Sequence, residues 1–172
     1  SDLRQRLNQE GCGTVEGLAI HSGRSLAQAR QRYAELKLPD PQVWLTRAGS
    51  EIHVGPELDY DDCWQHQIAQ DWDRDAVVEA LTDLQEHFTL QESAHQGPFK
   101  VSYLLREIDP QVVSMVSSRL RRQGLHAFPQ LRCHWFLDVL PRRASRSEAI
   151  RYLALRWNLH LDQVLIVASQ QG

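Results

Sequence analysis

The chain has 172 residues, 42% of them hydrophobic, a length that suits one domain or a small domain with an insertion. Its formal net charge of −3 gives no electrostatic reason to expect nucleic-acid binding, and no apolar stretch reaches the ~20 residues of a membrane span. The three cysteines are widely spaced and odd in number, which favours a reducing compartment, so we expect a cytoplasmic protein.

The first 54 residues alternate between strand and helix. Ser25 and Gln28 have the spacing of a capping box, which predicts a helix that runs to about Leu36 and ends before two prolines. Short apolar runs on both sides of this helix predict strands, and the last two flank the turn 48–50. The predicted strands are residues 18–20, 43–45 and 51–54.

The middle of the chain has a different pattern. Val77, Leu81, Leu84 and Phe88 recur at helical spacing, and a later helix is predicted between Asp109–Pro110 and Gly124. We also predict strands at 100–104, 125–128 and 131–137. Residues 55–139 are therefore predicted to form an inserted α+β cap.

After Pro141 the alternation of strand and helix resumes. Residues 145–148 form a second capping-box pattern, and the helix that follows is predicted to bury Ala149, Ile150, Leu153 and Trp157. The apolar run from Val164 predicts a buried closing strand that leads into a polar loop. We predict an α/β core built from residues 1–54 and 140–172.

Two short patterns resemble metal-binding motifs, but each lacks residues that such a motif needs. The pair Cys63 and His66 has no second pair at zinc-finger spacing. The acidic run 59–62 resembles a calcium loop, yet Trp64 and Gln70 replace the glycine and glutamate that such a loop requires. We therefore predict no metal site in either segment.

The segment HSGRS at 21–25 is the first candidate binding site. A strand is predicted to run into Ser22, Gly23 allows a tight turn, and Arg24 and Ser25 precede a helix. A hydroxyl, a guanidinium and the amides of a helix start can together bind an anion. The alternative is an ordinary strand-to-helix turn with Arg24 in solvent.

The segment LPRRASRSEA at 140–149 is the second candidate. Arg146 falls in the first helical turn, just after Arg142 and Arg143, where the helix dipole disfavours a cation by ~0.3–1 kcal/mol. A bound phosphate removes this conflict because it attracts the amides and the guanidinium groups alike. The alternative is a basic patch that faces solvent or a partner. We expect Ser22, Arg24 and Arg146 to share one cleft.

Five segments in order resemble the sucrose-phosphate phosphatase family of the haloacid dehalogenase superfamily. They are HSGRS (21–25), WLTRAGSEIH (44–53), FKVSYLL (99–105), LPRRASRSEAIRYL (140–153) and VLIVASQQG (164–172). The resemblance covers nearly the whole chain, and the second and fourth segments are its most specific parts. It implies a haloacid dehalogenase-like α/β fold, in which a parallel-sheet core carries an inserted α+β cap.

The resemblance also implies roles for individual residues. Ser22 matches the hydroxyl that binds the phosphoryl group, Arg146 stands at the position of the family's lysine, and Ser169 stands at that of a magnesium-binding aspartate. The implied phosphate-binding residues are Ser22, Gly23, Arg24, Arg143 and Arg146. The implied sugar-binding residues are Ser50, Glu51 and Lys100.

The departures from the family pattern bear on catalysis. Asp2 and Leu3 resemble the start of the first motif, DxD, but Arg4 stands where its second aspartate belongs, so the motif is either lost or outside these residues. Ser169 is neutral, and a hard cation prefers a carboxylate. We therefore predict no metal or cofactor for this chain, and magnesium for an intact active form.

Three functions remain open at this point. The first is a non-catalytic domain that binds sucrose 6-phosphate, or docks the true phosphatase, as in the phosphatase-like C-terminal part of sucrose-phosphate synthases. The second is an active magnesium-dependent sucrose-6-phosphate phosphohydrolase. The third is a purely structural interaction domain. The predicted partners are a sugar phosphate, the glycosyltransferase part of the same protein or a separate sucrose phosphatase, and neither nucleic acid nor membrane.

Overall fold

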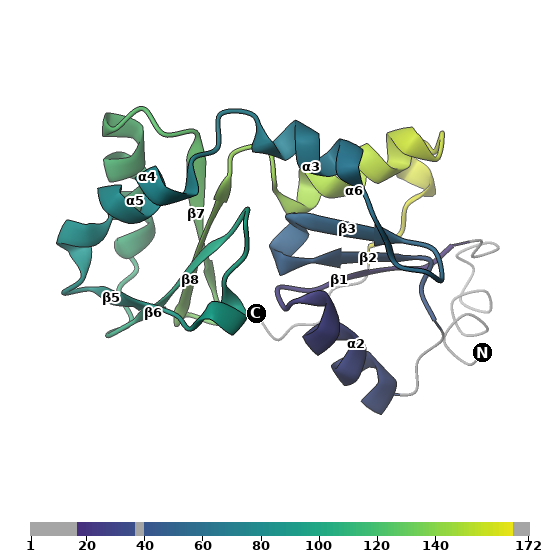
Figure 1. Cartoon of the computed structure of the whole chain (residues 1–172), viewed down its shortest axis with the longest axis horizontal. Helices are drawn as coiled ribbons and strands as arrows, with labels where there is room; N and C mark the ends of the chain where they lie inside the picture. Colours follow the sequence, from purple (N-terminus) through teal and green to yellow (C-terminus); the bar gives the residue numbers. More distant parts are fainter. Residues whose placement is uncertain (1–16, 37–39, 167–172) are drawn as a thin grey trace. The chain divides into compact units, whose positions relative to one another are not determined.

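The computed structural model describes residues 17–36 and 40–166, which form two compact units with one sheet each (Figure 1). Unit 1 holds the described residues up to Trp64 and those from Arg146 onward, and unit 2 is Gln65–Ser145. The sequence places the boundaries earlier, at 54/55 and 139/140. Strand pairing accounts for the difference, because β4 (Asp59–Tyr60) pairs within unit 1, and β8 (Phe136–Pro141) pairs within unit 2.

Unit 1 has a four-stranded sheet with the order β1-β2-β3-β4. β1 and β2 are parallel, whereas β3 is antiparallel to both of its neighbours. All four residues of β2 are buried. The first three strands, all predicted from the sequence, are β1 (Ala19–His21), β2 (Val43–Thr46) and β3 (Glu51–Val54).

The first helix of unit 1 begins where the sequence predicts. α2 (Leu26–Glu35) has the predicted capping box, since the Ser25 hydroxyl accepts from the Gln28 amide and the Gln28 side chain accepts from the Ser25 amide. The ring of Tyr33 packs edge-on against Trp44 of the sheet, with 5.1 Å between centroids. The other helices are η1 (Arg47–Gly49), α3 (Asp62–Ala69), which continues into unit 2, α6 (Arg146–Arg156) and η4 (Leu161–Gln163).

Unit 2 has an antiparallel sheet with the order β5-β6-β8-β7. Its strands are β5 (Phe88–Leu90), β6 (Val101–Leu105), β7 (Ala127–Arg132) and β8 (Phe136–Pro141). Its helices are α4 (Arg74–Ala80), η2 (Thr82–Leu84), η3 (Ser93–His95) and α5 (Val112–Arg122).

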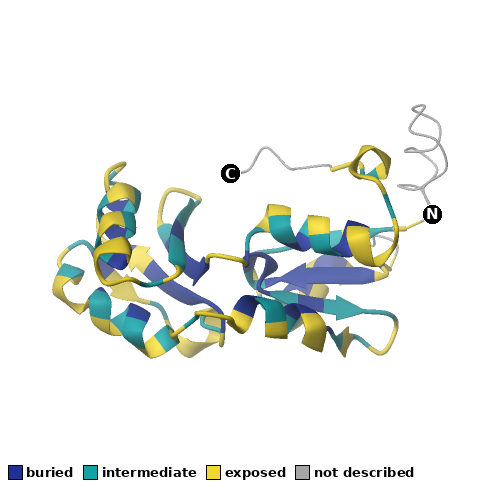
Figure 2. Cartoon of the chain, turned by 90° about the horizontal axis from the view of Figure 1, so that it is seen from above, coloured by how far each residue is buried: buried dark blue, intermediate teal, exposed yellow. Residues whose placement is uncertain are grey.

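The core of unit 2 lies between this sheet and two helices. The predicted apolar face of α5, Val112, Val116 and Leu120, is fully buried against β6 and β8 together with Val77 of α4. The helix ends before Gly124, whose φ of +70° is a left-handed conformation that glycine adopts without strain. Figure 2 shows that the buried residues concentrate in the strands.

Two predictions for the middle of the chain are wrong. The helix predicted over Val77–Phe88 ends at Ala80, because Phe88 belongs to β5 and pairs with Leu105. The single strand predicted at 131–137 is a hairpin, in which β7 and β8 are joined by a turn with Cys133 and His134 at φ of 51° and 62°. The sequence has no glycine or asparagine there to indicate a turn.

The end of the chain also differs from its prediction. Val164–Ile166 form no strand, and Leu165 and Ile166 are exposed. The rest of the predicted closing strand and its loop lie outside the described residues. In α6 the buried residues are Ala149, Leu153 and Ala154, whereas Trp157 is 38% exposed.

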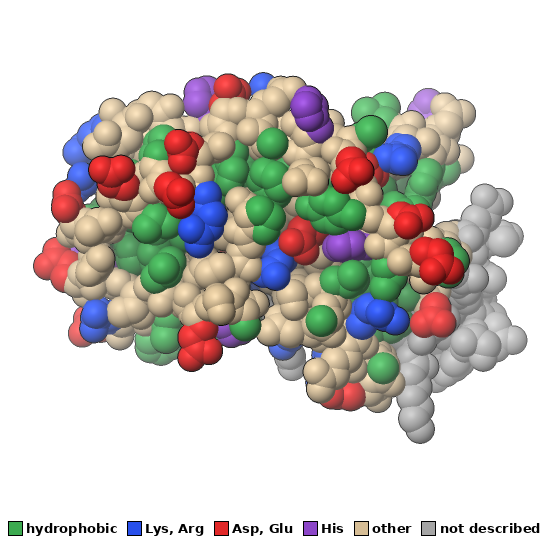
Figure 3. All heavy atoms as spheres, viewed as in Figure 1, with side chains coloured by type: hydrophobic (Ala, Val, Ile, Leu, Met, Phe, Trp, Pro, Cys, Tyr) green, Lys and Arg blue, Asp and Glu red, His purple; other side chains and the backbone are tan. Residues whose placement is uncertain are grey.

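Neither the described helices nor the charge distribution on the drawn face stands out for length or for a single sign of charge. None of the described helices combines the length and the apolar character needed to cross a bilayer. Basic and acidic side chains are interspersed on the face drawn in Figure 3. This distribution agrees with the small net charge of the chain.

Candidate anion-binding site

The turn after β1 and the loop after β2 are joined through their backbones. The strands are parallel, so their carboxyl ends lie at the same edge of the sheet. The amide of Arg47 donates to the carbonyl of Arg24 at 2.8 Å, and the amide of Ala48 donates to the carbonyl of Ser22 at 3.0 Å. The HSGRS turn and the WLTRAGSEI loop thus form one continuous surface.

The Ser22 side chain is oriented by its own turn. Its Oγ accepts a hydrogen bond of 3.1 Å from the amide of Arg24. Because the oxygen acts as the acceptor in this bond, the hydroxyl proton can be donated to another group. Ser22 can therefore donate to a phosphate oxygen, while Arg24 lies exposed beside it.

The η1 loop holds three consecutive residues in the left-handed region. Their φ angles are 47° for Arg47, 64° for Ala48 and 97° for Gly49. Side chains at positive φ cost about 1 kcal/mol each, and such strain tends to persist at functional sites. The Ser50 hydroxyl donates to the Arg47 carbonyl at 3.0 Å, so this fully buried side chain shapes the loop.

Glu51 is anchored by its neighbours. Its carboxylate accepts from the Thr46 hydroxyl at 3.0 Å and lies 2.9 Å from Nε of Arg47. Burial by itself would raise the pKa of Glu51, but the hydrogen bond from His53, the Arg47 charge and the hydrogen bond from Thr46 together lower it. Glu51 is thus a fixed anion next to the loop.

Arg146 lies near the same turn. It is the first residue of α6, it is exposed, and α6 packs against η1. Burial of His21 and the adjacent Arg146 charge lower the pKa of that histidine to about 4, although a hydrogen bond with the Ala48 backbone opposes the shift. The Arg146 charge therefore acts on the residue that precedes Ser22.

Two other predicted residues lie in unit 2 and are engaged there. Arg143 is hydrogen-bonded to the Gln70 side chain and lies 3.7 Å from the Asp71 carboxylate. Lys100 is 2% exposed, and its Nζ lies 3.3 Å from Asp138. Ser169 lies outside the described residues.

The Asp138 carboxylate contacts three polar side chains of the unit 2 sheet and its preceding loop. Besides Lys100, it accepts from the Ser102 hydroxyl and from Nε of Arg132 at 3.2 Å. Two cations and one anion thus lie close together, and Asp138 is completely buried. A buried carboxylate persists when it is paired and hydrogen-bonded in this way.

A protein-bound metal ion needs a cluster of ligating side chains. Across 17–36 and 40–166, no group of three or more His, Cys, Asp or Glu side chains is arranged to hold one. The family-equivalent magnesium positions fall outside these ranges.

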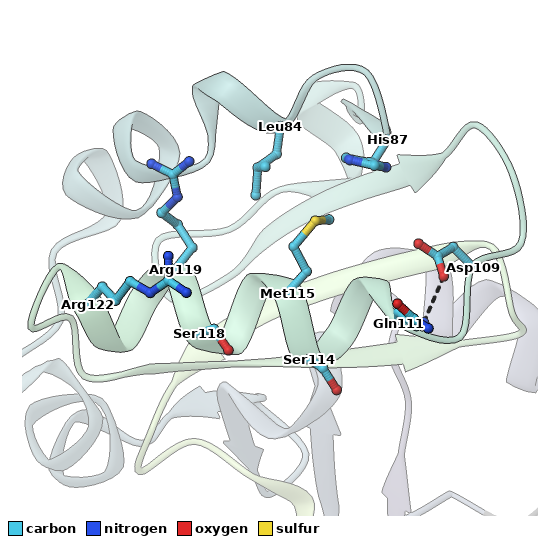
Figure 4. A pocket seen from close by; sticks show the side chains of 9 residues that line it. All are labelled: Leu84, His87, Asp109, Gln111, Ser114, Met115, Ser118, Arg119 and Arg122. Atoms are coloured by element: carbon cyan, nitrogen blue, oxygen red, sulfur yellow. Dashed lines mark hydrogen bonds between the residues drawn. The ribbon is translucent and has the colours of Figure 1, made fainter.

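A groove of about 640 Å³ lies elsewhere, along the outer side of α5 in unit 2 (Figure 4). Met115 points across it toward Leu84 and His87, and Asp109 accepts from the Gln111 amide at one end. At the other end Arg119 pairs with Asp83 at 3.4 Å. None of the residues predicted to bind phosphate or sugar lines this groove.

His21 and Arg47 are site residues that sequence reasoning missed. Both lie inside segments that carry the family resemblance, His21 directly before Ser22 and Arg47 three residues before Ser50. Their importance depends on burial and on positive φ, and neither property is visible in a residue pattern. The sequence signal that could have identified His21 as a site residue is its position next to Ser22.

Comparison with known proteins gives a consistent family. The whole chain, residues 1–172, matches the family model described as sucrose-6F-phosphate phosphohydrolase. It is 30% identical over 137 residues to sucrose-phosphatase 1 of Nicotiana tabacum, a match that covers 79% of this chain and 32% of that protein. The chain thus spans about a third of the tobacco protein.

A second relative belongs to a different enzyme. The chain is 25% identical over 185 residues to the sucrose-phosphate synthase of Zea mays, which covers 92% of this chain and 17% of the synthase. Among solved structures, the sucrose-phosphatase of Synechocystis sp. PCC6803 in complex with sucrose and phosphate matches with a TM-score of 0.82 and 29% identity. That match covers 94% of this chain and 65% of the other. A haloacid dehalogenase-like hydrolase of Bacillus subtilis, at 13% identity and a TM-score of 0.59, shares the fold.

Proposed function

Because the chain belongs to the sucrose-6F-phosphate phosphohydrolase family, we propose that it recognises sucrose 6-phosphate without hydrolysing it. The chain is a sucrose-phosphatase-like domain with a haloacid dehalogenase fold, and it is related to sucrose-phosphate synthase. In the proposal, unit 1 binds the phosphate and unit 2 is the cap. The solved Synechocystis relative holds sucrose and phosphate, which supports this class of ligand.

The pair of backbone hydrogen bonds between the two loops of unit 1 carries the proposal. These bonds hold Ser22 and Arg24 against Arg47, and α6 packs against the same η1 segment. A hydroxyl donor and exposed guanidinium groups at the carboxyl ends of parallel strands suit a phosphate. The fixed carboxylate of Glu51, close to this cationic loop, is a suitable acceptor for sugar hydroxyl groups.

The proposed lack of turnover rests on the sequence at Ser169. Phosphatases of this superfamily generally use magnesium, and the family places a metal-binding aspartate at this position. A hydroxyl is a poorer magnesium ligand than a carboxylate, so the metal affinity of such a site should fall. The proposed ligand binding requires no cofactor.

The proposed setting follows from the same relatives. Similarity to the maize synthase supports a domain that accompanies a glycosyltransferase, or that contacts a separate sucrose phosphatase. Cys63 and Cys133 are free and exposed, which supports a cytoplasmic location. Active hydrolysis is the second candidate, because the tobacco relative is a sucrose-phosphatase.

Titration calorimetry with the 172-residue chain tests the binding part. We expect inorganic phosphate and sucrose 6-phosphate to bind, sucrose 6-phosphate more tightly, and Ser22→Ala and Arg146→Ala each to weaken both by about tenfold. Arg151→Ala is the matched control, because Arg151 lies in the same helix and pairs with Glu148 on the surface. Equal affinity in all four proteins contradicts the proposed site.

Phosphate release tests the catalytic part. With magnesium and sucrose 6-phosphate, the chain is expected to release no phosphate above the buffer rate, and Ser169→Asp alone should not restore release. An authentic phosphatase serves as the positive control. Release that rises with protein concentration and disappears in Arg146→Ala establishes the hydrolase instead.

A further inference from the structure

Unit 2 has a second cavity, which we name the turn pocket. It has a volume of about 370 Å³, and its lining residues are Gln70, Asp71, His126, Arg142 and Arg143. All of them belong to unit 2, so the turn pocket shares no residue with the anion site proposed for unit 1. Its size falls within the range of small-molecule sites in proteins.

A tight turn at the end of β8 brings two arginines to the turn pocket. The amide of Ala144 donates to the carbonyl of Pro141 at 2.9 Å, so Arg142 and Arg143 are the central residues of a β-turn. Pro141 and Ala144 are buried, which fixes the turn, whereas both arginines are exposed. The amide of Arg142 donates to the carbonyl of His126 at 2.9 Å, one step beyond the β7–β8 ladder. The histidine therefore lies opposite Arg142.

The turn between α3 and α4 forms the other wall. Arg143 donates to the side-chain oxygen of Gln70, and its guanidinium lies 3.7 Å from the Asp71 carboxylate. The second distance is longer than a hydrogen bond, so Asp71 holds Arg143 only loosely. Because the Gln70 oxygen is the acceptor, its amide nitrogen keeps two N–H donors for another group.

The turn pocket carries an excess of positive charge. Two guanidinium groups are balanced by one carboxylate, and His126 adds a ring that donates at least one N–H in either protonation state. Within residues 17–36 and 40–166, the side chains of Arg142 and His126 have no hydrogen-bond or ion-pair partner. A phosphate group has more acceptor oxygens than a carboxylate, so a single phosphate can accept from all of these donors at once.

We propose that the turn pocket is a second anion site, which binds a phosphate group through Arg142, Arg143 and His126, with the Gln70 amide as a further donor. Free inorganic phosphate and a phosphate ester present the same oxygens to these donors. Asp71 limits the affinity, because its carboxylate repels the anion. The site needs no residue of unit 1, so it does not depend on the function proposed above.

Backbone amide chemical shifts test the site in the 172-residue chain. During titration with inorganic phosphate at constant ionic strength, the amide signals of Gln70, Arg142 and Arg143 should shift and saturate. They should do so equally in the double variant Ser22→Ala, Arg146→Ala, which disables the site proposed for unit 1. Acetate should bind more weakly. Shifts that do not saturate, or that disappear in the double variant, overturn the proposal. Tighter binding of sucrose 6-phosphate identifies an ester as the ligand, and equal or weaker binding identifies the free ion.

Point variants of opposite sign test the residues. Arg142→Gln should weaken phosphate binding by about tenfold, whereas Arg121→Gln, the same charge change at an exposed position of α5, should have little effect. Asp71→Asn should tighten binding by about threefold, because it removes the repulsion and asparagine tolerates the φ of 62° at this position. Asp75→Asn in α4 is its control. Equal effects of the two arginine variants, or weaker binding in Asp71→Asn, overturn the proposal.

The two anion sites can fail separately. If phosphate shifts the amide signals of Arg142 and Arg143 but not those of 22–25, the function proposed for unit 1 loses its binding site and the turn pocket is supported. The reverse pattern overturns the turn pocket and leaves the proposed function standing.

Discussion

The indole Nε1 of Trp64 donates a 3.0 Å hydrogen bond to the carbonyl oxygen of Gly49. Trp64 is completely buried at the start of α3, and Gly49 is the last of the three left-handed residues in η1. The bond therefore fastens a strained loop to the interior of unit 1. The loop conformation is thus supported by a buried hydrogen bond.

Trp64→Phe should destabilise the protein. The change removes the donor to a buried carbonyl and part of a large buried side chain, so we expect a loss of about 1–3 kcal/mol in the free energy of unfolding. Urea unfolding followed by circular dichroism measures it. Trp157→Phe is the control, because Trp157 is 38% exposed and its loss should be smaller. Equal losses of unfolding free energy in the two variants would show that the Trp64–Gly49 hydrogen bond adds no measurable stability.

The buried carboxylate of Asp61 should also stabilise unit 1. Its buried carboxylate accepts from the Trp64 amide at 3.0 Å, the Tyr152 hydroxyl at 2.8 Å and Nη1 of Arg156 at 2.6 Å. Asp61→Ala removes the shared acceptor of all three donors, although Nη1 of Arg156 keeps its 2.8 Å bond to the Tyr152 hydroxyl. We expect a loss of about 2–3 kcal/mol, less than for a fully buried pair because Arg156 is half exposed. Tyr152→Phe should cost about 1 kcal/mol.

The control for Asp61 is a surface ion pair in the same helix. Arg151→Ala breaks the exposed pair with Glu148 and should change stability by less than about 0.5 kcal/mol. Thermal and urea unfolding of the four proteins give the comparison. If Asp61→Ala unfolds no more easily than Arg151→Ala, the buried network does not stabilise α3 against α6.

The sequence predicts those features of the fold that local chemistry determines. The Ser25 capping box, the first three strands of unit 1 and the apolar face of α5 follow from local sequence patterns. The Asp61–Tyr152 bond joins residues 91 positions apart, and no spacing rule indicates it. The helix predicted through Phe88 fails for the same reason, because pairing with Leu105 overrides the local period.

The candidate site, like the fold, could be predicted only in part from the sequence. Ser22 and Arg24 precede a helix, and Arg146 begins one, so their suitability for an anion can be derived from residue types. The backbone bonds from Arg47 and Ala48 depend on positive φ at residues that are not glycine. Nothing in the side chains of arginine or alanine indicates that conformation.

A substitution in the hairpin turn of unit 2 should stabilise the protein, in contrast to the changes at Trp64 and Asp61. Cys133 is exposed and has a φ of 51°, a conformation that asparagine tolerates better than cysteine. Cys133→Asn should therefore stabilise the protein by about 0.5–1 kcal/mol. Cys63→Asn is the matched control, because Cys63 is also exposed but lies in α3. Urea midpoints measure both, and a gain in Cys63→Asn of equal size would rule out the turn as its cause.

His21 should make stability depend on pH. Its pKa is about 4 in the folded chain and 6.5 in the reference state, so the unfolded chain takes up the proton first as the pH falls. The stability supplied by the neutral ring is therefore complete above about pH 6.5 and is lost progressively toward pH 4, by up to roughly 3 kcal/mol. Urea unfolding at several pH values across this window measures the loss.

Two variants isolate the histidine in that experiment. His21→Leu cannot take up the proton, so its stability should fall less than that of the wild type between neutral pH and pH 4. Arg146→Gln should reduce the dependence without abolishing it, because burial is a larger cause of the shift than the arginine charge. His66→Leu, at an exposed position in α3, should leave the wild-type slope unchanged. Parallel curves for the wild type and His21→Leu would show that His21 does not enter the folded state as a neutral, buried ring.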